Sequence, residues 1–248
     1  MESTQTNNHS NKILTGSPDI DKWLEGGYER GIITMFYGPS ATGKSNFMML
    51  AACHQARAKK IIFIDSEGSF SLDRINQLSN NDSEGILKNI AILNPTSFEE
   101  QNRVFVKIKK ELQSENIGLI IVDSISMLYR LALADARKEG QEAVQKVNSD
   151  LANQMKILYE IARKRDIPVL ITGQVYNEFL SEEEWLSGKQ AGVNVVGGDL
   201  LKYWSKCTIE LQLEKGKKRA VIKKHRSLPE KDLYFEIFNE GVRKKGWL

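Results

Sequence analysis

The chain has 248 residues, of which 41% are hydrophobic and 27% are charged, and its formal net charge is +3 at pH 7. A chain of this length and composition can bury one full core, so we expect a single domain over residues 13–248 after a short polar leader, residues 1–12, which we expect to be disordered. The leader lacks the apolar segment of a secretion signal, and no stretch is apolar for long enough to cross a bilayer, so we expect a cytoplasmic protein that does not contact membranes.

Continuous apolar segments alternate with helical patterns along most of the chain. The first helix begins after Ser17, which can cap it, with Pro18 in its first turn. Strands are expected at 32–37, 59–65, 89–93, 118–123 and 167–174, and helices at 45–57, 98–112 and roughly 139–165. Because apolar strands that alternate with helices are buried on both faces, this order predicts an α/β fold whose mostly parallel sheet is flanked by helices. Residues 207–238 are rich in β-formers with little helix between them, which predicts antiparallel strands at the C-terminal end of the sheet.

The segment GPSATGKS, residues 38–45, matches the phosphate-binding pattern G-x-x-x-x-G-K-[ST]. A chance match in a chain of this length has a probability of roughly one in a hundred, and the strand before the segment and the helix after it are the context that the motif requires. Lys44 would reach the β- and γ-phosphates of a nucleotide, and the Ser45 hydroxyl would bind Mg²⁺. The expected nucleotide-binding residues are Gly38, Pro39, Ser40, Ala41, Thr42, Gly43, Lys44, Ser45 and Asn46.

Polar side chains follow three other predicted strands, at the sheet edge where ligands of α/β proteins bind. Asp123 can hold Mg²⁺ through water, or it can simply begin the loop. Glu67 can orient or deprotonate the water that attacks a γ-phosphate, or it can be a solvated turn residue. Gln174 can hydrogen-bond the γ-phosphate or the attacking water, and it can equally cap its strand.

Six motifs occur along the chain in this order: TGSPDIDKWLEGGYERGIITMFYGPSATGKS, FIDSEGSF, LIIVDSISMLYR, ITGQV, VVGGDLL and KKHRSLPE. In order and spacing they resemble the ATPase core of the RecA/RadA recombinase family, from about Thr15 to Val242, which is nearly the whole chain. The shortness of the chain, with MLYRLAL and KHRSLPE, makes it similar to the archaeal paralogues of RadA in particular. The resemblance implies a RecA-like P-loop ATPase fold that binds ATP and Mg²⁺.

The resemblance also implies a role for each site residue. Glu67 matches the catalytic glutamate, and Asp123 matches the Walker B acid on the Mg²⁺ side. Gln174 matches a glutamine that senses the γ-phosphate at the root of a DNA-binding loop. With Lys44, these residues form the expected catalytic and metal site. Arg74 matches an arginine that stacks on adenine, a contact suited to a planar guanidinium, although by its residue type alone it is an ordinary surface charge.

Two DNA-facing loops are implied by the same resemblance. The first spans residues 130–140, where Arg130, Arg137 and Lys138 could contact phosphates. The second spans residues 175–196 and carries the glutamates Glu178, Glu182, Glu183 and Glu184. Because neutralisation of the DNA backbone supplies much of nucleic-acid affinity, this acidic loop predicts modest DNA binding and little strand exchange.

The segment 214–226 is basic, since seven of its thirteen residues are Lys or Arg. Such lysines can protect an exposed edge strand from aggregation. The resemblance implies instead that Lys224 or Arg226 lies near the ATP of a neighbouring subunit and acts there on developing phosphate charge. The residues before Thr15 match neither the helical DNA-binding domain nor the aromatic polymerisation motif of full recombinases, so we expect weak self-association at most.

Three functions remain open at this stage. The first is an accessory protein of homologous recombination and DNA repair, which would bind ATP and single-stranded or branched DNA with limited sequence preference, act as a weak DNA-dependent ATPase, and contact a full-length recombinase or another repair protein. The second is an ATP-switched protein-interaction scaffold. The third is a KaiC-like signalling ATPase or a relative of hexameric helicases, against which the KHRSLPE motif argues.

Overall fold

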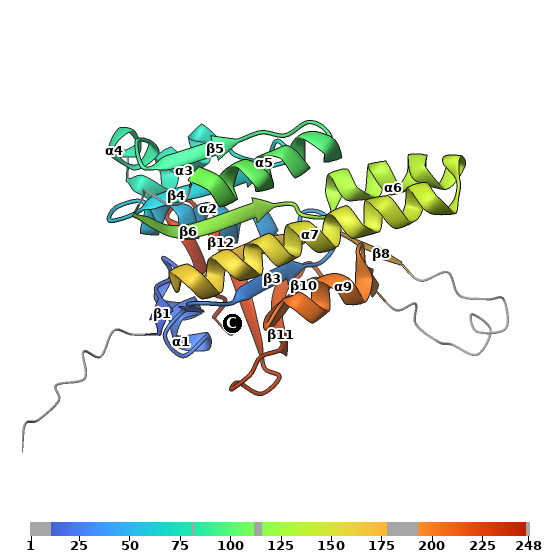
Figure 1. Ribbon diagram of the computed structural model, residues 1–248. Coiled ribbons are helices and arrows are strands. Elements are labelled where there is room, and N and C mark those ends of the chain that lie inside the picture. Colours follow the sequence, from blue (N-terminus) through green and yellow to red (C-terminus); the bar gives the residue numbers. More distant parts are fainter. Residues whose placement is uncertain (1–10, 81, 112–115, 178–192, 247–248) are drawn as a thin grey trace, which may run out of the picture.

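The computed structural model describes residues 11–80, 82–111, 116–177 and 193–246. Within these residues, nine strands form one sheet in the order β13-β12-β11-β10-β3-β7-β6-β4-β5 (Figure 1). Six of these strands, from β10 to β5, run parallel to their neighbours. They are β3 (Ile33–Tyr37), β4 (Lys60–Asp65), β5 (Ile90–Leu93), β6 (Ile117–Asp123), β7 (Val169–Gly173) and β10 (Cys207–Glu214).

The sheet continues past β10 with antiparallel strands. These are β11 (Lys217–Lys224), β12 (Asp232–Phe238) and β13 (Gly241–Lys244). Two short ribbons lie outside the sheet, β1 (Lys12–Ile13) with β2 (Tyr28–Glu29), and β8 (Val175–Asn177) with β9 (Val193–Val195). The expected α/β class, with a mostly parallel sheet and antiparallel strands at its C-terminal end, is confirmed.

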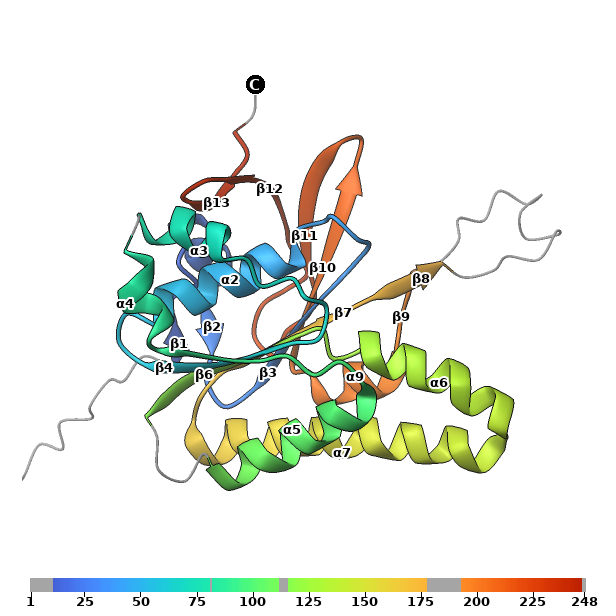
Figure 2. The same cartoon turned by 90° about the horizontal axis from the view of Figure 1, so that it is seen from above.

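Helices cover both faces of the sheet, as Figure 2 shows. One layer contains α1 (Pro18–Trp23), α2 (Lys44–Gln55), α3 (Leu72–Ser79) and α4 (Ser83–Leu87). The other contains α5 (Phe98–Glu111), α6 (Met127–Glu139), α7 (Gln141–Arg165) and α9 (Gly198–Trp204). Successive residues of β6 alternate between the two cores: Leu119 and Ile121 face the first layer, and Ile120 and Val122 the second. Each strand is therefore apolar on both faces, which is why it reads as a continuous apolar run.

The first expected helix is present and capped as predicted. The Ser17 hydroxyl accepts a hydrogen bond from the backbone N–H of Ile20 and donates one to the carbonyl of Val242, 2.6 Å away. The N-terminal turn is thereby tied to β13, a strand that the sequence interpretation did not include. Of the expected disordered leader, only residues 11 and 12 are described, and Lys12 lies in β1, paired with Glu29.

The expectation that residues 130–140 form a loop is wrong, because residues 127–139 form helix α6, and the expected contact of this segment with DNA stays a prediction. Its buried side packs on α5 and α7, with the Tyr129 ring 5.9 Å from the Phe98 ring and the Tyr129 hydroxyl bonded to Asn148. Gly140 then separates α6 from α7 at a φ of 121°, a conformation that favours glycine. The helical pattern expected from about residue 139 is therefore a second helix that begins at Gln141.

Among the described residues, no helix is both long and apolar enough to span a membrane.

Candidate active site

The P-loop joins the end of β3 to the start of α2, and two of its glycines have a positive φ and little room for a side chain. Gly38 has a φ of 149°, and a Cβ there would lie 2.1 Å from the carbonyl oxygen of Leu211 in β10. Gly43 has a φ of 110°, and its Cβ would lie 2.8 Å from the Ile237 side chain in β12. A larger residue at Gly38 would collide with the backbone of β10, and at Gly43 the positive φ itself favours glycine.

The N-terminus of α2 is left open for an anion. Gly43 is its N-cap and supplies no side-chain hydrogen bond, and the first turn carries no acidic residue. The first N–H groups of a helix lack intrahelical partners and lie at its positive end, so this geometry favours a phosphate. The expected phosphate loop thus has the backbone arrangement that its chemistry requires.

Lys44 lies within this loop, and its side chain is almost fully buried, with 8% of the residue exposed. The ammonium donates hydrogen bonds to the carbonyls of Gly38 and Pro39, at 2.8 and 2.9 Å. Burial lowers the pKa of Lys44, and the nearby carboxylates of Glu67 and Asp123 oppose that shift. The positive charge therefore lies close enough to interact with both predicted acids, although the three residues are far apart in the chain.

The register of the sheet explains why these residues meet. Asp65, the last residue of β4, is paired with Asp123, the last residue of β6, and Tyr37 at the end of β3 is paired with Gly173 at the end of β7. β3, β7, β6 and β4 are neighbours in this order. Their carboxyl ends therefore lie at one edge, and the segments that follow them converge on the P-loop.

Glu67 lies in a turn that Asp65 holds in place. The Asp65 carboxylate accepts hydrogen bonds from the N–H groups of Ser69 and Phe70, at 3.0 and 2.9 Å. The N–H of Glu67 donates to the carbonyl of Asp123, 3.3 Å away. These hydrogen bonds, to Asp65 and to Asp123, fix the backbone of the turn and thereby the position of the Glu67 side chain.

Asp123 is fully buried, and both of its carboxylate oxygens are hydrogen-bonded. Ser69 donates to Oδ2 at 2.6 Å, and Thr172 donates to Oδ1 at 2.5 Å. Together with the Ser45 hydroxyl, this carboxylate offers the hard oxygen ligands that Mg²⁺ prefers. Each carboxylate oxygen of Asp123 already accepts a hydrogen bond from a hydroxyl group. Asp123 is therefore suited to hold Mg²⁺ through water molecules bound to the ion, without a direct contact.

Gln174 connects Glu67 to the β8–β9 ribbon. Its side-chain amide donates a hydrogen bond to Oε1 of Glu67 at 2.9 Å, and its backbone N–H donates to the hydroxyl of Ser126 at 2.8 Å. Its carbonyl accepts from the N–H of Val196, 2.9 Å away in the chain that leaves β9. A displacement of Glu67 would therefore move Gln174, and through Gln174 it would change the position of this ribbon.

Arg74 lies on α3, and its guanidinium reaches the turn between β12 and β13. It donates to the carbonyls of Asn239 and Gly241, at 3.0 and 3.4 Å, and to the side chain of Gln77. Burial lowers the pKa of Arg74, and Glu240 opposes the shift. The structure holds this planar group at the β12–β13 turn, and its contact with adenine stays a prediction.

The predicted DNA-contacting residues lie on the exposed surface of α6. Arg130 and Arg137 are seven residues apart, which places them on the same face of a helix. Lys138 forms an exposed ion pair with Asp135 at 2.7 Å. The glutamates of the expected second loop, Glu178 and Glu182 to Glu184, lie outside the described residues.

Lys224 and Arg226 lie at the opposite edge of the sheet from the P-loop. Lys224 ends β11 and is paired with Thr208, near the start of β10. Its ammonium donates to the carbonyl of Lys202 at 2.8 Å, and Arg226 forms an ion pair with the buried Glu29 at 2.7 Å. Neither side chain is part of its own chain's phosphate site, and their action on a neighbouring subunit stays a prediction.

Several residues at the site are not predicted by the motifs and strand ends described above. Asp65 and Thr172 belong to apolar strands, where an acid and a β-branched residue read as ordinary strand positions. The ammonium of Lys218, on β11, bonds to the carbonyl of Ala41 in the P-loop, 177 positions away in sequence. Only Asp65, as the last residue of its strand, could have been found by the rule that located Asp123.

Comparison with known proteins gives consistent results. The model of the Rad51 family matches residues 7–245. Proteins called "DNA repair and recombination protein RadB" are similar: the one from Methanobrevibacter smithii is 37% identical over 94% of this chain and 96% of its own, and the one from Methanococcoides burtonii is 38% identical over 94% and 97%. A solved structure described as the RadB recombinase matches with a TM-score of 0.74 and 31% identity, covering 94% of this chain and all of that one. These findings confirm the resemblance to the recombinase family that the motifs indicate.

Proposed function

The chain belongs to the Rad51 family, and we propose that it is an ATP- and DNA-binding accessory protein of homologous recombination and DNA repair, with a slow DNA-dependent ATPase activity and little strand exchange. The observation that carries this proposal is the convergence of Lys44, Glu67 and Gln174 at one sheet edge, with a direct hydrogen bond between the last two. An ATPase that responds to DNA needs such a link between the phosphate site and a DNA-facing segment.

Each group at the site has a chemical role in this proposal. The P-loop amides and Lys44 bind the β- and γ-phosphates of ATP. Glu67 orients the attacking water and accepts its proton. The Ser45 hydroxyl and, through water, Asp123 hold Mg²⁺, which neutralises charge on the phosphate oxygens when it is bound. Gln174 couples Glu67 to the β8–β9 ribbon, and Arg74 stacks on the base.

DNA binding is proposed to use α6, with Arg130, Arg137 and Lys138 on backbone phosphates. These contacts carry no sequence information, so the preference would be for single-stranded or branched DNA of any sequence. The acidic residues between β8 and β9 in the sequence would repel the phosphates of a second DNA strand. This repulsion supports the proposal of limited strand exchange. A full-length recombinase or another repair protein is the proposed protein partner, and self-association is expected to be weak.

The test is the rate of ATP hydrolysis with and without single-stranded DNA at about 50 and 200 mM salt. We expect stimulation by DNA that falls steeply at the higher salt, because phosphate contacts release counterions. A variant with Arg130→Ala and Arg137→Ala should lose most of the stimulation, and Lys88→Ala, an exposed charge on the opposite helical layer, should retain it. A rate that DNA does not change would favour the ATP-switched scaffold instead, and a pulldown with and without ATP would then identify its partner.

A second prediction concerns the neighbouring-subunit role of Lys224 and Arg226. Lys224→Ala should lower DNA-stimulated hydrolysis about tenfold or more, by loss of charge stabilisation in the transition state, and leave ATP affinity nearly unchanged. The change at Arg226 should be made both to Ala and to Lys, because Ala removes the ion pair of the buried Glu29 carboxylate and would also destabilise the fold. Lys223→Ala, on the other face of β11, is the matched control. An unaltered rate in Lys224→Ala and in the Arg226 variants would reject the role.

A further inference from the structure

One side of the P-loop lies against three neighbouring strands, β10, β11 and β12. A Cβ at Gly38 would meet the backbone of β10, and a Cβ at Gly43 would meet the side chain of Ile237 in β12. Near the start of β11, the Lys218 ammonium donates a hydrogen bond to the carbonyl of Ala41, in the middle of the loop. Of these three approaches, the one from β11 is made by a charged group.

Lys218 faces the loop because of its position in the strand. Side chains alternate between the two faces of a strand, and Ala220 and Ile222 belong to the core on the α2 side of the sheet. Lys218 shares their parity, so its side chain leaves β11 on the side of α2 and the P-loop. Arg219, on the opposite face, has two acidic partners. Within the described residues Lys218 has no acidic partner, and its ammonium bonds to the Ala41 carbonyl.

Ala41 has a backbone conformation that an alanine rarely adopts. Its φ is 61°, in the left-handed region, where the Cβ of an L-residue comes too close to the following carbonyl oxygen. A strained residue of this kind persists where the surrounding structure holds it in place. The hydrogen bond from Lys218 is such a restraint, because it acts on the carbonyl of the strained residue itself.

The Ala41 carbonyl shares a planar peptide group with the N–H of Thr42. This peptide bond is trans, so its carbonyl and its N–H point in opposite directions. A carbonyl that is held toward Lys218 therefore directs the Thr42 N–H away from β11. Thr42 is 1% exposed, and within the part of the chain that the structure describes its N–H has no hydrogen-bond acceptor. A buried backbone donor requires an acceptor, and a phosphate oxygen in the loop would supply one.

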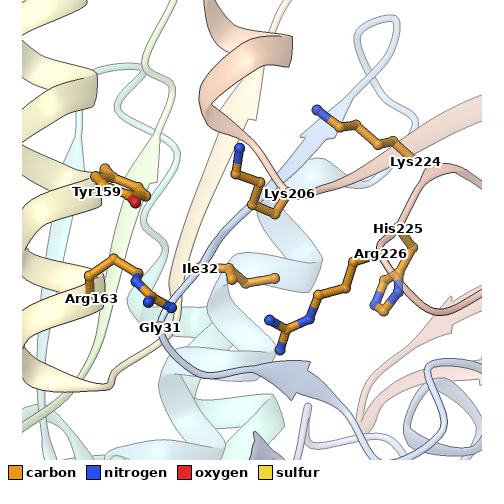
Figure 3. A pocket seen from close by; sticks show the side chains of 8 residues that line it. All are labelled: Gly31, Ile32, Tyr159, Arg163, Lys206, Lys224, His225 and Arg226. Carbon is orange, nitrogen blue, oxygen red and sulfur yellow. The ribbon is translucent and has the colours of Figure 1, made fainter.

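The position of Lys218 also separates it from the lysine at the other end of β11. The strand runs from the P-loop edge of the sheet to the opposite edge, where Lys224 lines the pocket that Figure 3 shows. Six residues of strand span roughly 20 Å, so Lys224 does not reach the P-loop of its own chain. Lys217 is exposed and lies beside Lys218 on the other face of the strand, which makes it the matched control.

We propose that Lys218 is a positioning residue of the nucleotide site, which holds the Ala41 carbonyl and thereby keeps the Thr42 N–H directed at a phosphate of the nucleotide. The inference rests on the proposed binding of ATP at the P-loop. Lys218 acts through the shape of the loop and does not contact the reacting atoms. It therefore stabilises bound ATP and leaves the chemical step unchanged.

The first experiment compares Lys218→Met, which removes the donor and keeps an aliphatic stem, with Lys218→Arg, which restores a donor. In titration calorimetry with ATP and Mg²⁺, Lys218→Met should weaken binding about fivefold or more, the equivalent of one hydrogen bond. Lys218→Arg and Lys217→Met should stay within about twofold of the unmodified chain. Turnover at saturating ATP should be unchanged in all three, so that the effect appears in KM and not in kcat. A thermal melt of each variant verifies that the fold is intact.

The second experiment is a double-mutant cycle with Ala41→Gly, which separates loss of the restraint from loss of a positive charge. Glycine adopts the left-handed conformation without strain, so in the Ala41→Gly chain Lys218→Met should change ATP affinity less than about twofold. An equal effect of Lys218→Met in both backgrounds would show a general effect of charge and would overturn the proposal. An equal loss of affinity in Lys217→Met would overturn it in the same way.

The Lys44→Ala chain distinguishes failure of this proposal from failure of the proposed function. If Lys44→Ala loses ATP and Lys218→Met binds ATP like the unmodified chain, the P-loop is the nucleotide site and the positioning role of Lys218 is rejected. If neither variant loses ATP, the nucleotide site itself is wrongly assigned and the positioning role is rejected with it.

Discussion

Replacement of Lys44 by Ala is expected to abolish ATP binding, with a loss of affinity of a hundredfold or more. Lys44 is proposed to donate to both the β- and γ-phosphates, and hydrogen bonds to charged groups are worth about 1.5–3 kcal/mol each. Two of them therefore correspond to about 3–6 kcal/mol, and every 1.4 kcal/mol is about tenfold in affinity. Titration calorimetry with ATP and Mg²⁺ measures the change directly.

The structure provides controls for this experiment. The Lys44 ammonium also bonds to the Gly38 and Pro39 carbonyls, so a thermal melt of the variant separates loss of phosphate contact from loss of the loop structure. Lys88→Ala is the control, since it removes an exposed lysine that pairs with Glu84. An ATP affinity in Lys44→Ala within threefold of the unmodified chain, at unchanged stability, contradicts the assigned phosphate site.

Replacement of Glu67 by Gln is expected to leave ATP binding within about threefold and to slow hydrolysis by roughly 10²–10⁴, the range for loss of a positioned general base. The substitution keeps the shape of the side chain and a carbonyl oxygen that can still accept from Gln174. It removes only the ability to take a proton. A single-turnover measurement of ATP hydrolysis, combined with a titration of ATP, separates the two effects.

Glu84→Gln is the matched control, since Glu84 is an exposed acid on α4 away from the strand ends. Its turnover should equal that of the unmodified chain. A Glu67→Gln chain that hydrolyses ATP at the normal rate would show that another group activates the water. If this variant and Lys44→Ala both bind and hydrolyse like the unmodified chain, the site lies elsewhere.

Asp123 and α6 show which features could be predicted from the sequence and which could not. Asp123 could be placed because an apolar run that ends in an acid marks the carboxyl end of a buried strand, and such ends meet at one edge. Helix α6 was misassigned as a loop, although MLYRLALADARKE carries a helical spacing of apolar residues. The apolar side of this helix is buried only when α6 packs against α7 and α5. That packing includes contacts between residues distant in sequence.

The sequence by itself determined the phosphate loop, the alternation of strands and helices, and the position of three polar residues at or just after strand ends. Each depends on local pattern and on the rule that the carboxyl ends of parallel strands share an edge. The tertiary structure alone decided the order and register of the strands. These place Ser69 and Thr172 on the two oxygens of Asp123 and join Gln174 to Glu67. The physical reason is that hydrogen bonds and charge pairs between distant segments form only after the sheet has fixed their positions, and no local spacing encodes them.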